Sequence, residues 1–288
     1  MNLSKLKNKK IAILGIGYIG SNILNYLKSL DINLHITVIT KKNLDIIEKN
    51  EFDYLINSSG NSGDFRTQLI ETIDSNLGLN SYILEKAKIK ESYIYISSSR
   101  VYGFTNENNI IFNEDSTNCY NNLDLDFIYD GSKKLAESLL YNYSKDLDYK
   151  IGILRLSNVY GKFNNFDDST LIKKIIRYKQ ENKKSLFIKQ NRNSMKDYIY
   201  IDDVVESIIT VMLNIKNTDI YNLAYGKSYS LDEVSKFLNL KIETDDNIEP
   251  IYSNVSNEKL SKEFGIKLKY SLMDGLENNF KRTIDGCD

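Results

Sequence analysis

Residues 11–20 read Ile-Ala-Ile-Leu-Gly-Ile-Gly-Tyr-Ile-Gly, and this stretch decides which fold the sequence predicts. Its four leading apolar residues predict a buried strand, and the glycines predict a tight turn that opens a helix at about 18–30. Apolar residues recur on one face of that helix, at Ile19, Ile23, Leu27 and Leu30. A strand, a glycine turn and an amphipathic helix in this order predict the start of a strand–helix–strand unit.

The glycines of the turn have separate physical roles. Gly15 permits the tight turn, Gly17 lets backbone amides approach a pyrophosphate, and Gly20 lets helix and strand pack closely. The amino end of the helix, with Tyr18 and Ile19, then stabilises the phosphate charge. The pattern predicts a dinucleotide-binding loop, and a glycine turn that binds no ligand is the alternative.

Strands and helices alternate through the first half of the chain. Strands are expected at 10–15, 35–40, 53–58, 93–98 and 151–156. Helices are expected at about 18–30, 66–89 and 131–147, the last with Leu135, Leu139 and Tyr143 on its apolar face. Near-continuous apolar strands that alternate with helices predict a parallel sheet covered on both faces. The expected fold is therefore a Rossmann-type doubly wound α/β fold, with ligands at the carboxyl ends of the strands.

The pattern becomes less regular after residue 158. We expect 1–158 to form the Rossmann domain and 159–288 to form a small α+β substrate lobe. A helix near 168–182 belongs to that lobe. The helix at 203–214 is expected to pack back on the first domain, with these residues inward: Val204, Val205, Ile208 and Met212.

Composition excludes several classes of function. The formal net charge of −1 gives no electrostatic case for a nucleic acid or a membrane surface. His35 is the single histidine, which argues against a histidine-dependent nucleophile triad and against a histidine-rich metal site. Cys119 and Cys287 lie far apart without metal-type spacing, which fits a reducing cytoplasm. No apolar run is long enough to predict a membrane-spanning helix, and glycines interrupt the one that resembles a signal peptide.

The end of the second strand indicates which dinucleotide is bound. In NAD enzymes an acidic residue about 20 positions beyond the glycine loop binds the ribose 2′-hydroxyl. Here the strand ends in Thr40, Lys41 and Lys42, with no carboxylate at its tip. Two cations favour a 2′-phosphate, so NADP(H) is the favoured cofactor and NAD(H) is the alternative. The other interpretation is that both lysines are ordinary surface charges.

A tyrosine and a lysine four residues apart lie on one helix face. Tyr129 and Lys133 are singled out because they follow a strand that ends in Ser98 and because they begin a helix. The lysine ammonium stabilises a phenolate, and the tyrosine exchanges a proton with a carbonyl or hydroxyl oxygen while a hydride moves. Ser98 holds the same oxygen. The spacing occurs three times in the sequence, at Tyr82/Lys86, Tyr129/Lys133 and Tyr141/Lys145.

Further motifs follow in a fixed order. They read SSSRVYG at 97–103, YDGSKKLAE at 129–137, LRLSNVYG at 154–161, KDYIYIDDV at 196–204 and YNL at 221–223. With the glycine loop, this set resembles the extended short-chain dehydrogenases/reductases of the NAD-dependent epimerase/dehydratase family, which act on nucleotide sugars. The resemblance covers nearly the whole chain and implies a homodimer built from the helices at 66–89 and 131–147.

The resemblance also implies roles for single residues. Ser98, Tyr129 and Lys133 would be catalytic, and Lys133 would also bind the nicotinamide ribose. Asn158 matches the family residue near the substrate diphosphate, and Lys196 replaces an arginine that binds substrate phosphate. Substrate contacts are expected from Ser99, Asn158 and Lys196. Cofactor contacts are expected from Gly15, Gly17, Tyr18, Ile19, Gly20, Thr40, Lys41, Lys42, Ser58, Asn76, Tyr129 and Lys133.

One departure from the family bears on the reaction. The 4,6-dehydratases of this family place Asp and Glu after the catalytic Thr, whereas Ser99 and Arg100 stand at those places here. Dehydration is therefore not expected. The favoured reaction is NADPH-dependent reduction of a 4-keto (often 6-deoxy) nucleotide sugar, and the alternative is an NAD-dependent 4-epimerase. A non-catalytic dinucleotide-binding protein is a third interpretation, against which the retained Ser98, Tyr129 and Lys133 argue.

Overall fold

The computed structural model describes residues 2–60, 65–119, 123–161 and 170–284. The chain forms two compact units that are interleaved in sequence. The first unit comprises residues 1–101, 120–155 and 205–221, and the second comprises 102–119, 156–204 and 222–288. The division of the chain into domains at residue 158 stays a prediction.

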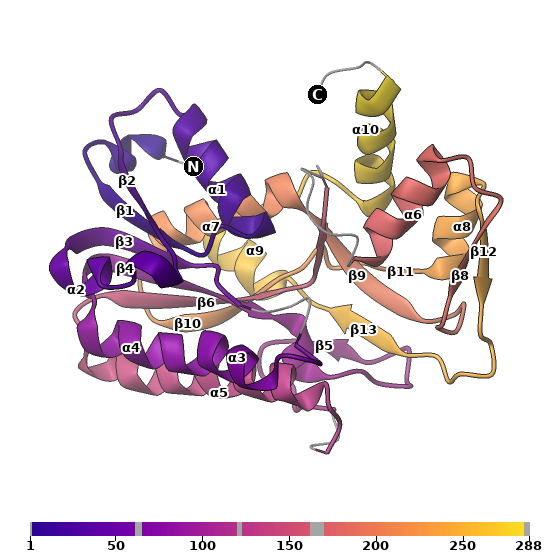
Figure 1. Cartoon of the computed structure of the whole chain (residues 1–288), viewed down its shortest axis with the longest axis horizontal. Helices are drawn as coiled ribbons and strands as arrows, with labels where there is room; N and C mark the ends of the chain where they lie inside the picture. Colours follow the sequence, from indigo (N-terminus) through magenta and orange to yellow (C-terminus); the bar gives the residue numbers. More distant parts are fainter. Residues whose placement is uncertain (1, 61–64, 120–122, 162–169, 285–288) are drawn as a thin grey trace. The chain divides into compact units, whose positions relative to one another are not determined.

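The first unit contains a central sheet, in which the described residues form six strands in the order β10-β6-β4-β3-β1-β2 (Figure 1). β1 runs parallel to both β2 and β3, and β3 runs parallel to β4. The strands are β1 (Lys10–Leu14), β2 (His35–Ile39), β3 (Glu51–Asn57), β4 (Lys88–Ser98), β6 (Lys150–Leu156) and β10 (Asp219–Leu223). The predicted Rossmann-type α/β fold is confirmed.

Helices cover the two faces of this sheet. In Figure 1 the helices α3, α4 and α5 run along one face, and α1 lies on the other. The α-helices are α1 (Tyr18–Ser29), α2 (Ile46–Lys49), α3 (Leu69–Ile73), α4 (Leu79–Lys86), α5 (Phe127–Tyr143) and α7 (Ile201–Asn214). A π-helical turn, η3 (Asp74–Gly78), joins α3 to α4. Short 3-10 turns lie at η1 (Leu3–Leu6), η2 (Lys41–Asn43), η4 (Ser99–Tyr102) and η5 (Ser144–Asp146).

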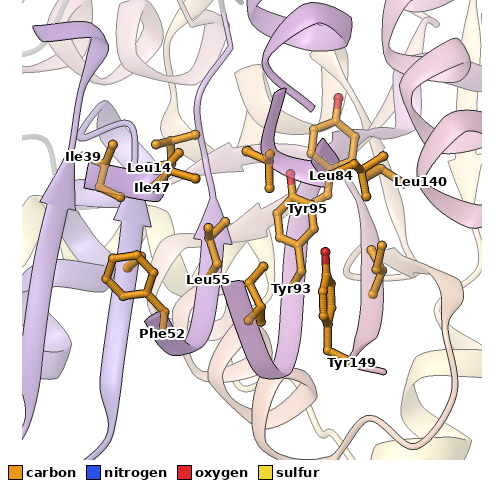
Figure 2. Packing of buried hydrophobic residues seen from close by; sticks show 14 of the residues in the cluster. Leu14, Ile39, Ile47, Phe52, Leu55, Leu84, Tyr93, Tyr95, Leu140 and Tyr149 are labelled. Atoms are coloured by element: carbon orange, nitrogen blue, oxygen red, sulfur yellow. The ribbon is translucent and has the colours of Figure 1, made fainter. Parts of the chain in front are cut away.

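A buried apolar cluster fills the space between the sheet and the helices α2, α4 and α5 (Figure 2). Strand residues such as Leu14, Leu55 and Tyr95 contribute one side of it, and Leu84 and Leu140 contribute the other. Burying side chains of this size stabilises the fold by about 1.5–3 kcal/mol each. This packing fixes the strand ends, and so it fixes the residues that directly follow them.

The apolar face predicted for the helix at 131–147 is correct at Leu139, which packs against the core cluster, and wrong at Leu135 and Tyr143. Helix α5 begins at Phe127, and Leu135 and Tyr143 on that face are 55% and 44% exposed. The buried face instead carries Tyr129, Asp130, Ser132, Lys133, Ala136, Glu137 and Leu140. Polar residues occupy much of the buried face of α5 because they form hydrogen bonds and ion pairs inside the unit. The spacing of the apolar residues therefore did not identify the buried face correctly.

The second unit is built around a smaller sheet with the strand order β11-β9-β13-β5, and β7 pairs with β9. Two further strands, β12 and β8, pair with each other. The strands are β5 (Ile111–Phe112), β7 (Asn158–Tyr160), β8 (Ser185–Ile188), β9 (Met195–Tyr200), β11 (Ser228–Ser230), β12 (Lys241–Thr244) and β13 (Tyr252–Val255). The helices are α6 (Leu171–Gln180), α8 (Leu231–Leu238), α9 (Glu258–Phe264) and α10 (Leu272–Ile284).

Two buried carboxylates hold loops of the second unit in place. Asp197 accepts hydrogen bonds from the backbone amides of Tyr225, Gly226 and Lys227. Asp203 accepts them from the amides of residues 269 and 270. Backbone amides that would otherwise be buried without partners are satisfied in this way.

A search of the described helices for a membrane span found none of sufficient length and hydropathy. A search of the same part of the chain for groups of three or more acidic, histidine or cysteine side chains that could hold a metal ion also found none.

Candidate active site

The glycine turn lies between β1 and the amino end of α1, as predicted. Gly15 has a φ of +80°, and a Cβ there would come within 2.8 Å of the Ser59 backbone. A Cβ on Gly20 would collide with the Gly15 carbonyl and with Ser58 Oγ, which itself donates a hydrogen bond to that carbonyl at 2.7 Å. Open space surrounds Gly17, which begins α1 without a side-chain cap. The amino end of this helix therefore presents backbone N–H groups to an anion.

A second polar site lies where Gly60 follows the end of β3. A Cβ on Gly60 would lie 3.2 Å from Asn76 Oδ1 and 3.3 Å from Lys133 Nζ, so a side chain at this position would crowd both groups. Asn76 Nδ2 donates to Ser132 Oγ at 3.0 Å, whereas its buried Oδ1 has no partner among the described residues. A buried acceptor without a partner is costly and indicates a bound hydroxyl or water.

Lys133 lies one helical turn beyond Tyr129 on the buried face of α5. Its Nζ donates a hydrogen bond to the Ile96 carbonyl at 2.8 Å and lies 4.7 Å from the centre of the Tyr95 ring. Burial lowers the pKa of Lys133 to about 7, against the opposing charge of Glu137. The Lys133 ammonium therefore loses its proton easily near neutral pH. A ligand that accepts a hydrogen bond beside Gly60 would stabilise its charged form.

Tyr129 is buried in the first turn of α5, and Ser98 stands at the carboxyl end of β4. Burial raises the pKa of Tyr129, and the negative charge of Asp130 raises it further. The positive charge of Arg100 and the Ser98 hydroxyl lower the pKa. The backbone N–H of Arg100 donates to Ser98 Oγ at 3.2 Å and so fixes that hydroxyl. The structure brings Ser98 and Tyr129 together.

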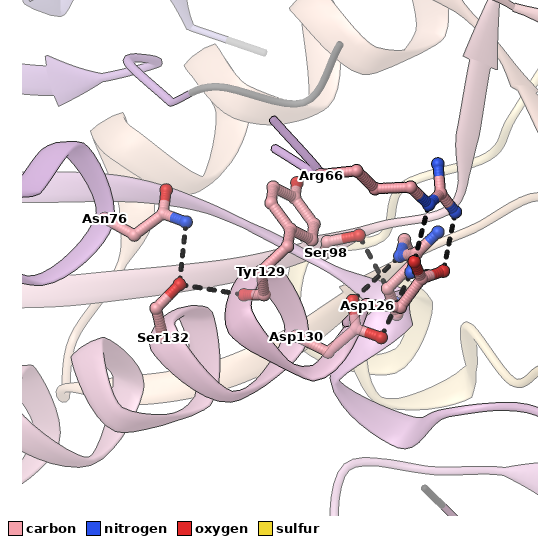
Figure 3. A network of polar contacts seen from close by, with 8 residues as sticks. Arg66, Asn76, Ser98, Asp126, Tyr129, Asp130 and Ser132 are labelled. Carbon is pink, nitrogen blue, oxygen red and sulfur yellow. Dashed lines mark hydrogen bonds and ion pairs between the residues drawn. The ribbon is translucent and has the colours of Figure 1, made fainter. Parts of the chain in front are cut away.

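A network of arginines and carboxylates lies on one side of the tyrosine (Figure 3). Arg100 binds Asp130 through Nε at 2.8 Å and Nη2 at 3.2 Å, and its Nη2 also contacts Asp126 at 2.9 Å. Arg66 then forms two bonds of 2.6 Å to Asp126. Phe65 packs against the Tyr129 ring at 5.1 Å between centroids. Two-point Arg–carboxylate contacts restrict geometry strongly, so this side of Tyr129 is well ordered.

A second charged pair lies deeper, behind β4. Arg155 binds Glu137 through Nε and Nη2, at 3.0 Å and 2.8 Å, and both side chains are only 1% exposed. Ser97 Oγ also donates to Glu137 at 2.6 Å. This pair joins α5 to the two central strands β4 and β6, directly below the serine-tipped strand end.

The residues expected to choose the dinucleotide lie at the tip of β2. Thr40 caps the turn η2 together with Asn43, whose Oδ1 accepts the Thr40 backbone N–H at 2.7 Å. Lys41 forms an exposed ion pair with Glu71 of α3, and Lys42 is exposed. An ion pair in solvent contributes little to stability, so Lys41 remains free to reorient toward a ligand.

The residues expected to bind substrate divide between the two units. Ser99 is buried in η4 of the first unit. Asn158 of β7 and Lys196 of β9 lie on paired strands of the second unit. Asn158 Nδ2 donates to the Asp197 carbonyl at 2.8 Å, and Lys196 Nζ donates to Gln190 at 3.3 Å and lies 5.6 Å from the centre of the Phe104 ring.

Sequence reasoning missed the charged partners of this site. Asp126 and Asp130 are four residues apart and flank Tyr129, a spacing that could have indicated a clamp for one cation on the same helix face. In the sequence, Arg100 stands out only as a departure from the dehydratase pattern. Its pairing with α5 is a tertiary contact, which no local pattern reveals.

Comparison with solved structures supports the fold. The chain matches MoeE5 in complex with UDP-glucose and NAD with a TM-score of 0.80 and 19% identity, over 96% of this chain and 99% of that one. It matches RMD from Pseudomonas aeruginosa complexed with NADPH with a TM-score of 0.75 and 19% identity, over 93% and 96% of the two chains.

Sequence relatives and a family model agree with this. The chain is 29% identical to a dTDP-D-glucose 4,6-dehydratase of Dictyostelium discoideum over 254 residues, which cover 83% of this chain and 57% of the relative. It is 28% identical to dTDP-4-dehydro-6-deoxyglucose reductase of Escherichia coli, over 53% of this chain and 51% of that one. The chain thus spans about half the length of these curated relatives. The model of the NAD dependent epimerase/dehydratase family matches residues 11–224, and the chain belongs to this family.

Proposed function

We propose that this chain is an NAD(P)-dependent oxidoreductase that acts on a nucleotide-activated sugar, most favourably by NADPH-dependent reduction of a 4-keto (often 6-deoxy) sugar. The observation that carries the proposal is the buried Tyr129 in the first turn of α5, with Lys133 one turn further on and Ser98 at the carboxyl end of β4. A proton donor at this edge of the sheet lies on the side where parallel α/β sheets bind their ligands.

The residues at the strand ends fit a nicotinamide dinucleotide. The open amino end of α1 at Gly17 suits a pyrophosphate, and Asn76 Oδ1 and Lys133 Nζ beside Gly60 suit ribose hydroxyls. When bound, such a cofactor supplies or accepts a hydride. Lys41 and Lys42 favour the 2′-phosphate of NADPH. The proposed cofactor contacts are the twelve residues that the sequence singled out, from Gly15 to Lys133.

In the proposed reduction, Tyr129 donates its phenolic proton to the sugar carbonyl oxygen while the carbonyl carbon receives a hydride. The ketone becomes a secondary alcohol, and the phenolate recovers its proton from solvent before the next turnover. Ser98 donates a hydrogen bond to the same oxygen and so holds the carbonyl in reach. Ser99, Asn158 and Lys196 are proposed to contact the nucleotide sugar.

The charged network favours reduction over dehydration. Loss of water from the sugar needs an acid beside the catalytic hydroxyl, where Ser99 and Arg100 stand here. The Arg100 guanidinium is bound to Asp130 and Asp126, and both carboxylates are thereby engaged. Neither is available as a general acid for elimination.

Replacement of the proton donor tests the reaction. Tyr129→Phe is expected to lower kcat on a 4-keto nucleotide sugar by about 10²–10⁴-fold, because the proton donor is lost. Tyr141→Phe, which alters the exposed tyrosine of another Tyr-x-x-x-Lys pair, is expected to leave kcat within about twofold of the wild type. Full turnover by Tyr129→Phe would refute the mechanism.

The dinucleotide that accompanies the purified protein separates the two candidate reactions. Denatured protein that releases no dinucleotide, together with tighter binding of NADPH than of NADH, is expected for a reductase that exchanges its cofactor in each turnover. Stoichiometric NAD released on denaturation would contradict the NADPH proposal and favour a 4-epimerase instead.

We also propose that the protein forms a homodimer and acts in the cytoplasm. Exposed apolar residues gather on α3 and α5, where Ile70 and Leu135 are 72% and 55% exposed. They adjoin a groove lined by Ile73, Leu77, Phe127 and Ile128. Leu135→Asp is expected to shift the protein toward monomer in sedimentation velocity. Phe187→Asp, which alters an equally exposed residue of β8, is expected to leave the mass unchanged. A monomeric wild type would contradict the dimer.

A further inference from the structure

We propose that Arg100, clamped by Asp130 and Asp126, is a positioning residue that stabilises negative charge on the Tyr129 oxygen. This inference rests on the proposed function, in which Tyr129 gives up its proton and is left as a phenolate. Arg100 touches neither substrate nor cofactor in this role, because it acts through the tyrosine.

Geometry places the guanidinium against the aromatic side of the tyrosine. The Arg100 Cζ lies 5.7 Å from the centre of the Tyr129 ring and 5.1 Å from that of Phe65. The clamp leaves little freedom, because two carboxylates one helical turn apart bind the same guanidinium. The Arg100 side chain is 26% exposed, so solvent screens its field only partly.

Arg100 also neutralises the negative charge of Asp130, which opposes ionisation of Tyr129. Asp130 follows Tyr129 in sequence, is 4% exposed, and has a carboxylate that disfavours a phenolate nearby. Burial raises the pKa of the Asp130 carboxyl, and its bond to Arg100 opposes this rise. Loss of Arg100 would therefore remove a favourable charge and expose an unfavourable one. Loss of the Asp130 charge would act in the opposite direction, while Asp126 still holds Arg100.

The titratable and charged groups around Tyr129 come from every element that packs against it. They are Tyr95 and Ser98 from β4, Arg100 from η4, Arg66 beside Phe65, and Asp126, Asp130 and Lys133 from α5. Among them, Arg100 and Asp130 are the charges that act most strongly on Tyr129.

The experiment measures the ionisation of residue 129 directly, in the full chain without substrate. A fluorinated tyrosine that ionises while the protein is folded is inserted at position 129 with a suppressor tRNA and titrated by 19F NMR. Arg100→Gln is expected to lower its acid dissociation constant about tenfold, and Asp130→Asn to raise it about threefold. The double variant is expected to return to within about threefold of the wild type.

Three comparisons decide the outcome. A purely structural role predicts that Arg100→Gln and Asp130→Asn change the constant in the same direction or not at all, and either result would overturn the proposal. Arg100→Lys keeps the positive charge, so the acid dissociation constant of residue 129 is expected to stay close to its wild-type value. Arg66→Gln, which removes the exposed neighbour of Asp126, is expected to change it less than twofold.

The same variants separate this proposal from the proposed function. If Tyr129→Phe abolishes turnover but the titration does not respond to Arg100→Gln, the inference about Arg100 fails alone. If Tyr129→Phe retains full turnover, the proposed function fails whatever the titration shows. Where both hold, the pH profile of kcat is expected to move in the same direction as the titration in each variant.

Discussion

Helix α5 carries two arginine–carboxylate clusters, and they differ in almost everything except their chemistry. Near its amino end, Asp126 and Asp130 bind Arg100, and the arginine side chain is 26% exposed. About two to three turns further on, Glu137 binds Arg155, and both side chains are 1% exposed. The first cluster borders Tyr129, the proposed proton donor, whereas the side chains of the second are almost fully buried.

The difference shows how one helix separates support from reactivity. A fully buried pair is costly to break, since a lone charge in the interior has no solvent to stabilise it. A partly exposed pair is cheaper to alter and more responsive to its surroundings. The deep cluster therefore fixes α5 against β4 and β6, and the shallow cluster adjusts the electrostatics of Tyr129.

Breaking the deep cluster is expected to have the largest effect on stability. Glu137→Ala removes the α5 carboxylate that binds the buried Arg155 and is expected to lower the free energy of unfolding by about 3–5 kcal/mol in urea denaturation. Glu137→Leu combined with Arg155→Met removes both charges and is expected to be less destabilising than Glu137→Ala. A loss below about 1 kcal/mol for Glu137→Ala would show that the buried pair is not an anchor.

Lys133 lies between the clusters, is buried, and has no hydrogen bond to a carboxylate among the described residues. Its pKa of about 7 in the folded chain lies below its unfolded value, so folding removes a proton that the unfolded chain holds, and stability falls as the pH falls from about 10 toward 7. Lys133→Met is expected to raise the free energy of unfolding by about 1–3 kcal/mol near pH 6, and by less near pH 9. Urea denaturation at both pH values measures this. An equal gain at both would contradict the assigned cause.

Altering the shallow cluster is expected to have the smallest effect on stability. Asp130→Asn retains a hydrogen-bond acceptor and leaves Arg100 bound to Asp126, so a loss of about 1 kcal/mol is expected. The urea midpoint, compared with that of Glu137→Ala, gives the contrast between the clusters directly. If Asp130→Asn destabilises the chain as much as Glu137→Ala does, the two clusters are equivalent and the distinction fails.

Local patterns sufficed for the fold and for much of the candidate site. Strands such as 35–39 and the turn at Gly15 follow from apolar runs and from a backbone that only glycine tolerates there. The inward face of α5 could not be predicted in this way, since Lys133 and Glu137 are buried through partners on other elements. Pairing between residues far apart in sequence, such as that of Arg100 with Asp130, produces no periodic sequence pattern from which it could be predicted.

The π-helical turn Asp74–Gly78 has a consequence for how homologous sequences can be aligned and altered. Such a turn accommodates one residue more than an α-helical turn, and here it holds the buried Asn76. Because the wide turn absorbs the extra residue, deleting one residue here would convert it to an α-helical turn and leave α4 in register. A homologue one residue shorter in this segment is therefore expected to keep Ile83 and Leu84 in the core and to lose the Asn76 contact to Ser132.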